Sequence, residues 1–419
     1  MPVPTGRYNE VRRLEVVMSG PLDGVRVVEI AGVGPAPFAA MLLADMGAEV
    51  IRVDRVDAIE QSPGMDDPRF RIPERSRLSV AVDLKSPEGA EIVLRLAGTA
   101  DALVEGFRPG VAERLGIGPD ECRARNPRLV YGRMTGWGQQ GPLSGRAGHD
   151  INFISVAGAL HPVGLAGQPP VPPVNLVGEG SGGMLLAYGI VCALLEARLS
   201  GAGQVVDAGI VDGAAVPLST MLGMRAAGTW NTERGTNTLD SGAPFYGTYR
   251  CADGEYVAVG AAERHFFDRL LETLGVADDP RAAGSRLDPG RWDAMKECIA
   301  EAFAARSRAE WMAVFEDVDA CVTPVLSLDE VAGHPHNRAR GTFLDIEGVV
   351  HPAAAPRFSR TRTAAPRPPA APGRDSADVL RAAGYTHQQI TGFVERRVVV
   401  CQDRTAGSVI DRTGGRTPC

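Results

Sequence analysis

Short apolar strands alternate with helices through the first half of the chain, and this alternation constrains the fold more than any other feature. The sequence predicts a strand over residues 25–30, a helix over 37–46 that Gly47 ends, and a second strand over 49–53. A strand, a helix and a strand in this order form a βαβ unit, in which the two strands lie parallel in one sheet. The chain therefore begins as an α/β protein with a Rossmann-like sheet.

The same alternation continues as far as residue 208. Further strands are expected over 78–82, 102–104, 129–133 and 204–208. Helices are expected over 87–97, where Pro87 occupies the first turn, and over 178–198, a strongly apolar segment that begins with glycines. Strands that alternate with helices in this way favour a parallel sheet covered by helices.

The sequence pattern changes at about residue 242. From there, predicted strands rich in Tyr and Phe are followed by predicted amphipathic helices around Phe266 and Trp311. This change predicts a second, smaller α+β domain. A Pro-, Ala- and Arg-rich stretch over 352–372 is typical of an extended connection, and two short closing helices are expected over 376–393. The predicted organisation is a disordered leader over 1–17, the first part of a large α/β domain over 18–235, the small domain over 236–335, the return segment of the large domain over 336–395 and a disordered tail over 396–419.

Composition excludes several classes of protein. The net charge of -7 argues against a broad phosphate-binding surface, so no nucleic-acid partner is expected. The seven cysteines include no C-x-x-C pair, which disfavours a disulfide framework and a zinc site and favours a cytoplasmic location. The N-terminal residues lack the apolar run of a signal peptide, and the longest apolar stretch, 184–195, is too short to span a bilayer. No membrane partner is therefore expected.

Several common catalytic motifs do not occur in the sequence. The patterns of serine hydrolases, P-loop nucleotide hydrolases and zinc proteases are absent. Gly32 and Gly34 follow the first strand, and Asp54 lies about twenty residues further on, as in a dinucleotide site. Pro37 occupies the place of the third glycine, so the turn is interpreted as a strand-to-helix corner.

Basic side chains gather in the loops and at the strand ends of the α/β part. They are Arg55, Arg75, Arg77, Lys85, Arg108 and Arg114. Taken one by one, each is better explained as a solvated surface charge. If the fold brings them to one edge of the sheet, however, their positive charges suit a polyphosphate ligand.

Two acid–base candidates lie in glycine-rich segments. His149 and Asp150 follow a predicted strand, where the sites of α/β proteins tend to lie, and Glu179 stands at the start of the apolar helix. Each alone also fits a structural role, the histidine as a satisfied polar group and the glutamate as an acid at a helix N-terminus. Together they suggest two bases that move a proton on and off one carbon from opposite faces. Glu263 is a candidate to orient the histidine, although a plain surface charge is the simpler interpretation.

Five ordered segments, spread between Gly20 and Phe393, are specific enough to compare with known proteins. They read GPLDGVRVVEIAGVGPAPFAAMLLADMGAEVIRVDR, VEGFRPGVAERLG, RMTGWGQQGPLSGRAGHDIN, GQVVDAGIVDG and DACVTPVL. In these segments the sequence resembles the α-methylacyl-CoA racemases within the family III CoA-transferase (CaiB/BaiF-like) superfamily. Long matches that keep their order along the chain are improbable by chance.

The resemblance implies a fold, an assembly and a site. It implies a large α/β domain, a smaller domain and an interlocked homodimer whose active sites lie between the large domain of one chain and the small domain of the other. It also implies His149 as one catalytic base, Glu263 as its hydrogen-bonding partner and the carboxylate at position 179 as the second base. The coenzyme A contacts that it implies are Arg55, Arg75, Lys85, Arg108, Arg114 and Asp150, the last of which also belongs to the expected catalytic group.

One position departs from the family, because the racemases and transferases have aspartate where this chain has Glu179. The expected activity is racemisation of 2-methyl-branched acyl-CoA thioesters by 1,1-proton transfer through an enolate, with no metal or redox cofactor. The alternatives are a family III CoA transferase with Glu179 as nucleophile, a biosynthetic CoA-thioester enzyme with altered chemistry, or a CoA-binding protein without racemase activity. His149 argues against the transferase, since the family's transferases lack histidine there.

Overall fold

The computed structural model describes residues 20–57 and 67–402, so the predicted leader over 1–17 lies outside the described residues. The chain divides into two compact units. Unit 1 comprises Met1–Phe153, Gly178–Gly213 and Gly341–Cys419, and unit 2 comprises Ile154–Val177 and Ala214–Arg340. The predicted large domain over 18–235 therefore includes two segments that belong to unit 2, namely residues 154–177 and 214–235.

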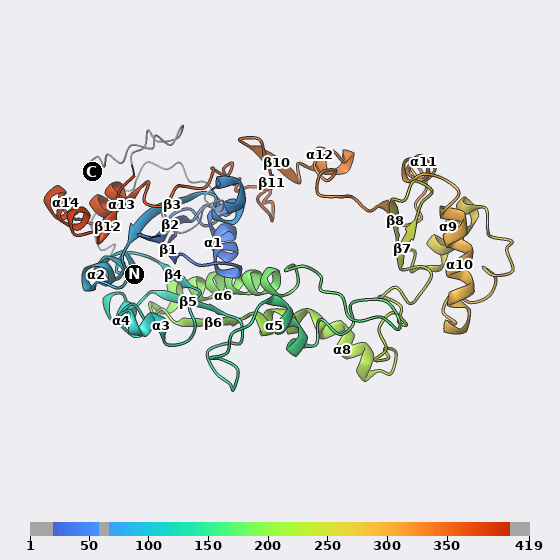
Figure 1. Ribbon diagram of the computed structural model, residues 1–419, viewed down its shortest axis with the longest axis horizontal. Helices are drawn as coiled ribbons and strands as arrows, with labels where there is room; N and C mark the ends of the chain where they lie inside the picture. Colours follow the sequence, from blue (N-terminus) through green and yellow to red (C-terminus); the bar gives the residue numbers. More distant parts are fainter. Residues whose placement is uncertain (1–19, 58–66, 403–419) are drawn as a thin grey trace, which may run out of the picture. The chain divides into compact units, whose positions relative to one another are not determined.

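Unit 1 contains a seven-stranded sheet with the strand order β12-β3-β2-β1-β4-β5-β6 (Figure 1). The strands are β1 (Arg26–Ile30), β2 (Glu49–Arg55), β3 (Arg77–Val82), β4 (Ala102–Glu105), β5 (Val130–Thr135), β6 (Val205–Gly209) and β12 (Val399–Val400). Six of them run parallel and β12 pairs antiparallel with β3, which confirms the predicted parallel α/β sheet. Because β12 lies within the predicted tail over 396–419, the prediction of disorder is wrong for the residues up to 402.

Helices cover both faces of this sheet. Unit 1 contains α1 (Pro35–Asp45), the 3-10 helix η1 (Pro68–Glu74), α2 (Pro87–Ala97), α3 (Val111–Arg114), α4 (Pro119–Arg125), α6 (Gly178–Ser200), α13 (Ser376–Ala382) and α14 (His387–Glu395), with the hairpin β10 (Phe343–Ile346) and β11 (Val349–Pro352). Neighbouring strand residues face opposite layers: Val27 packs in a core with α1 and α6, whereas Val28 packs in a core with α2, α13 and α14. Two further helices cross the boundary between the units, α5 (Asp150–Ala157) and α7 (Ile210–Ala215).

Helix α6 is the central helix of unit 1. Its Gly183 lies against α1, since a β-carbon at this position would come within 2.6 Å of Phe38 Cδ1 and 2.9 Å of the Pro35 carbonyl oxygen. Among the described residues, α6 is also the one helix that is long and apolar enough to cross a membrane by length and composition. Its glycine-bearing face packs against α1 and the sheet, as a core helix does, and its other face is exposed.

Unit 2 is built around a three-stranded antiparallel sheet with the order β7-β8-β9. Its elements are the 3-10 helix η2 (Val216–Leu218), α8 (Ser219–Ala226), β7 (Gly247–Arg250), β8 (Tyr256–Val259), α9 (Arg264–Leu274), the 3-10 helix η3 (Pro289–Arg291), α10 (Trp292–Phe303), α11 (Arg308–Val314), β9 (Val322–Pro324) and α12 (Pro335–Arg340). Aromatic rings fill its core, with Phe303 packed against both Tyr249 and Trp311. The α+β character predicted for this part of the chain is confirmed.

The cysteines of the described residues are mostly free thiols. Cys122, Cys251 and Cys298 are buried, and Cys192 is exposed. Cys401 is the exception because it is disulfide-bonded. The sequence disfavours a disulfide framework, and one bonded cysteine among the described residues does not amount to one.

Candidate active site

The parallel strands of unit 1 end at one edge of the sheet, and the strand order reverses at β1. From β1 the chain proceeds to β2 and β3 on one side and to β4, β5 and β6 on the other. Ligands of open α/β sheets bind in the crevice at the carboxyl ends of the strands where the order reverses. The loops after β1 and β4 are therefore the natural place for a site.

Glu179 lies at this edge. It occupies the first turn of α6 and is half-buried. Its carboxylate lies over Gly34, the last residue of the loop between β1 and α1: a β-carbon at Gly34 would be 3.2 Å from Oε1 and 3.3 Å from Cδ of Glu179. Gly34 is the N-cap of α1, so the carboxylate lies at the positive end of that helix's dipole.

Asp150 begins helix α5, close to the start of α6, and His149 precedes it directly. The side chain of Asp150 is 2% exposed, and its Oδ1 accepts a hydrogen bond from the backbone N–H of Glu179 at 2.6 Å. The other oxygen, Oδ2, is buried without a hydrogen-bond partner among the described residues. His149 is exposed, and its backbone N–H donates to Asn152 Oδ1 at 3.0 Å. The buried aspartate thus links the backbone that carries the imidazole to the backbone that carries the carboxylate.

Arg55 and Lys85 lie together at the ends of β2 and β3. Arg55 pairs in register with Val82, and Lys85 follows β3 by three residues. The Arg55 guanidinium donates to Asp57 at 2.8 and 2.6 Å. The pKa of Asp57 is lowered, chiefly by these hydrogen bonds and to a smaller extent by the charge of Lys85. Both basic side chains are exposed, as a binding role requires.

Arg108 and Arg114 are exposed on the segment that follows β4. The start of this segment is held by Glu105, whose Oε2 accepts the backbone N–H of Phe107 at 2.6 Å. Arg133 donates to Glu105 at 3.1 Å and to Glu113 at 2.8 Å. Burial raises the pKa of Glu105 to about 7, even though the N–H of Phe107 and the charge of Arg133 act in the opposite direction.

Two of the basic residues singled out in the sequence are buried instead. Arg75 is 1% exposed, and its three side-chain nitrogens contact Asp45 and the carbonyl oxygen of Pro352. Arg77 is equally buried and donates to Glu29 at 2.9 Å. The condition that the fold brings all six basic side chains to one sheet edge is therefore not met by these two, which are buried. The guanidinium of Arg75 is engaged inside unit 1, and its predicted contact with CoA stays a prediction.

Glu263 belongs to unit 2. It is the exposed N-cap residue of α9, and its side chain makes no capping hydrogen bond. Its charge contributes to the raised pKa of Cys321, after the larger effects of burial and of Asp319. The predicted hydrogen bond to His149 joins residues of two units and stays a prediction.

The sequence alone did not identify Gly34 or the Glu105–Arg133 ion pair as parts of the candidate site. Gly34 was interpreted as a corner glycine, and nothing in its local sequence indicates a contact with Glu179. Glu105 and Arg133 did carry a signal, since each is a charged residue in or at the end of an otherwise apolar strand. A charge in such a place is usually paired, because an unpaired buried charge is strongly unfavourable.

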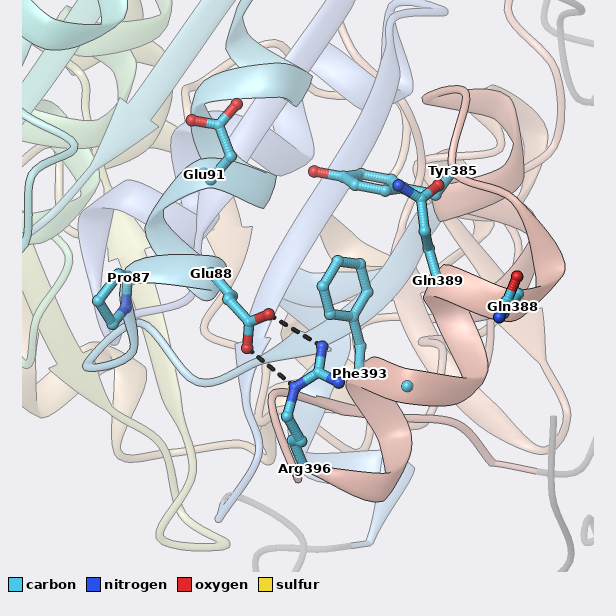
Figure 2. Close-up of a pocket in the computed structure, with 9 residues that line it drawn as sticks. Pro87, Glu88, Glu91, Tyr385, Gln388, Gln389, Phe393 and Arg396 are labelled. Carbon is cyan, nitrogen blue, oxygen red and sulfur yellow. Dashed lines mark hydrogen bonds and ion pairs between the residues drawn. The ribbon is translucent and has the colours of Figure 1, made fainter.

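A groove on the outside of unit 1 lies away from these residues. It runs between α2 and α14, with Tyr385 and Phe393 along its wall (Figure 2). Glu88 and Arg396 close one side through hydrogen bonds of 3.2 and 2.9 Å. These helices cover the sheet face opposite α1 and α6, so the groove contains none of the predicted site residues.

The fold and its sheet edge define a doubly wound α/β protein with the Glu179 carboxylate at the switch point and His149 next to the aspartate that holds the Glu179 backbone. The chain belongs to CoA-transferase family III, whose model matches residues 22–376. It is 42% identical to the α-methylacyl-CoA racemase of Mus musculus over 382 residues, which cover 90% of this chain and 97% of the relative. The human racemase is 41% identical over 379 residues, covering 88% of this chain and 95% of the relative.

A solved structure supports the fold independently. A CAIB/BAIF family protein from Brucella suis matches 87% of this chain and 100% of its own, with a TM-score of 0.76 at 24% identity. At this level of identity the match concerns the fold alone.

Proposed function

We propose that this chain racemises 2-methyl-branched acyl-CoA thioesters. The observation that carries the proposal is the link between the two acid–base residues: Asp150, next to His149, accepts the backbone N–H of Glu179 at 2.6 Å. An imidazole and a carboxylate are suited to a proton transfer in which one group acts as base and the other as acid. The similarity to the mouse and human racemases supports the same conclusion.

The reaction moves one proton off the α-carbon and another onto it. One of His149 and Glu179 takes the α-proton, and the electron pair of the broken C–H bond becomes that of an enolate. The other residue, protonated at the start, gives its proton to the opposite face of the same carbon. The thioester leaves with inverted configuration and unchanged oxidation state, so this chemistry requires no metal or redox cofactor.

The coenzyme A moiety would bind along the same sheet edge. The exposed cations Arg55, Lys85, Arg108 and Arg114 supply positive charge for its phosphates. The negative net charge of the whole chain does not oppose this, because a small anionic ligand responds to the local cluster.

A transferase is the second candidate, because CoA-transferase family III is the family whose model matches. In that reaction Glu179 would attack the thioester carbonyl and release CoA as its thiolate, leaving an acyl–glutamyl anhydride. A biosynthetic CoA-thioester enzyme with altered chemistry is a further alternative. The transferase requires an acyl acceptor, whereas racemisation proceeds with one substrate alone.

A homodimer is part of the proposal. The face of α6 that points away from the sheet is apolar, and Tyr188, Leu195 and Leu199 on it are exposed by 69%, 62% and 84%. An apolar stripe of this kind is typical of a surface covered by another protein, and a second copy of the chain is the proposed partner. Replacing Leu195 by Glu is expected to shift the mass measured by light scattering from dimer to monomer; an unchanged dimer would place the interface elsewhere.

The deciding experiment is α-proton exchange in deuterium oxide, measured separately on the (R)- and (S)-2-methylacyl-CoA without any acyl acceptor. The native chain is expected to exchange both enantiomers. His149→Ala and Glu179→Gln are expected to abolish interconversion, each leaving exchange of the enantiomer whose α-proton the other base removes. A native chain that exchanges neither enantiomer, but transfers CoA when an acceptor acid is added, would establish the transferase instead.

A further inference from the structure

We propose that Gly34 is a positioning residue for the catalytic carboxylate of Glu179. The missing side chain at Gly34 makes the space in which the carboxylate lies, and so determines proton transfer on one face of the substrate. This inference rests on the proposed racemase function. It concerns a residue that touches the base and acts on the substrate only through it.

The contact between the two residues is close and involves the whole carboxylate. A β-carbon at Gly34 would lie 3.2 Å from Oε1, 3.3 Å from Cδ and 3.4 Å from Oε2 of Glu179. The first two separations are shorter than ordinary van der Waals contact, and the third lies at its lower limit. Gly32 has no such role, because the nearest atom to a β-carbon there is the carbonyl oxygen of Ile30 at 4.0 Å.

The backbone on both sides of this contact is firmly held. Pro35 and Pro37, in the first turn of α1, are buried and have restricted φ angles. The first turns of α6 pack closely against this helix, because Gly183 would meet the Pro35 carbonyl oxygen at 2.9 Å if it had a β-carbon. Neither helix can therefore move aside easily. An added methyl group at Gly34 would displace the flexible side chain of Glu179 instead.

The displacement would be small but catalytically visible. A misplacement of about 1 Å in a reacting group can lower a rate by about a hundredfold, so a shift of a few tenths of an ångström is expected to lower it by roughly threefold to tenfold. Only exchange of the enantiomer whose proton Glu179 removes should change, because His149 serves the other face. A general weakening of the fold would slow both enantiomers alike.

The test compares Gly34→Ala with two matched controls. Gly32→Ala adds the same methyl group on the same loop without the contact. Gly201→Ala adds it at another glycine with positive φ, 81° against 75° for Gly34, where no atom lies within 4 Å. Exchange of each enantiomer, kcat and KM are measured for every variant, with thermal unfolding as the measure of strain. We expect Gly34→Ala to slow one enantiomer by roughly threefold to tenfold and both controls to stay within about twofold of the native rates.

Repeating the Gly34→Ala substitution in a Glu179→Asp variant shows whether its effect comes from the steric contact with the Glu179 carboxylate. Glu179→Asp shortens the side chain and withdraws the carboxylate from Gly34. In that background Gly34→Ala should change exchange by less than about twofold, since interacting residues give non-additive effects. An equal effect in both backgrounds, or an equal loss for both enantiomers, would overturn the inference.

Two further outcomes can be told apart from a failure of the inference itself: a Gly34→Ala variant that does not fold, and a native chain that has no exchange activity. If Gly34→Ala does not fold, Gly34→Asn replaces it, because asparagine adopts a positive φ more readily than alanine does, and the same one-sided loss is expected. If Gly34→Asn exchanges both enantiomers as fast as the native chain, the inference is wrong. If the native chain exchanges neither enantiomer, the proposed function fails, and with it the inference that depends on it.

Discussion

The carboxylate of Asp150 accepts the backbone N–H of Glu179 at 2.6 Å, so a residue at the start of α5 holds the first turn of α6. Asp150 is buried, whereas its neighbour His149 is exposed. The aspartate therefore connects the two acid–base residues through backbone positions instead of sharing their protons. This relationship has a measurable consequence.

Asp150→Ala should lower kcat for both enantiomers by about ten- to hundredfold, because it releases the backbone of both His149 and Glu179. The unpaired N–H of Glu179 should also lower the free energy of unfolding by about 1–3 kcal/mol. Asp150→Asn keeps an acceptor oxygen and should recover most of the rate. Steady-state kinetics and urea unfolding check both effects, and a rise in KM alone, with kcat unchanged, would show that Asp150 acts on CoA binding instead.

The raised pKa of Glu105 predicts a pH-dependent stability. In the folded chain the pKa is about 7, against a usual value of 4.5, so the folded state binds more protons between these values. Stability is therefore highest below about pH 4.5 as far as this group is concerned, and falls as pH rises through 7, by at most about 3 kcal/mol.

Glu105→Gln, which cannot ionise, removes this dependence. Relative to the native chain, the variant should gain stability between pH 5 and pH 8, because the native chain must then bury a charged carboxylate. Urea unfolding at several pH values measures the difference. A difference that stays constant over this range would mean that Arg133 keeps the native carboxylate ionised throughout.

Lys85 and Arg108 are expected to act on CoA binding and not on the chemical step. Lys85→Ala and Arg108→Ala should each raise KM by about two- to fivefold with kcat nearly unchanged, and added salt should reduce the difference. Arg125→Ala, which removes an exposed charge paired with Glu91 on another part of unit 1, is the matched control. An equal rise in KM for Arg125→Ala would indicate a general charge effect instead of contacts at the sheet edge.

Arg75 is expected to matter for stability. Removing its guanidinium leaves Asp45 buried without its charged partner, so Arg75→Met should lower the free energy of unfolding by about 3–5 kcal/mol. The KM of the folded fraction should stay within about twofold of the native value because the Arg75 nitrogens are engaged inside unit 1. A raised KM with unchanged stability would support the CoA contact that the family resemblance implies.

The elements of unit 1 were largely predictable because each depends on local sequence. Helix α2 spans Pro87–Ala97 as predicted, with a proline in the first turn and the side chain of Ser86 as its cap. The boundary between the units was not predictable in the same way. Ile154 and Leu160 pack with Ala214 in one small core of unit 2, and this contact joins segments that lie far apart in the sequence.

The sequence by itself determined the order of strands and helices, the parallel sheet and the chemical types of the residues that follow its strands. Hydrophobic period and turn residues act over a few positions, so they can be recognised without the fold. Only the tertiary structure decided that Arg55 is exposed while Arg75 is buried, and that the Glu179 carboxylate lies over Gly34. These outcomes depend on how α6 packs against α1 and how loops meet at one sheet edge. Such contacts join residues that are far apart in the sequence, and the local sequence around one residue does not indicate which distant residue it contacts.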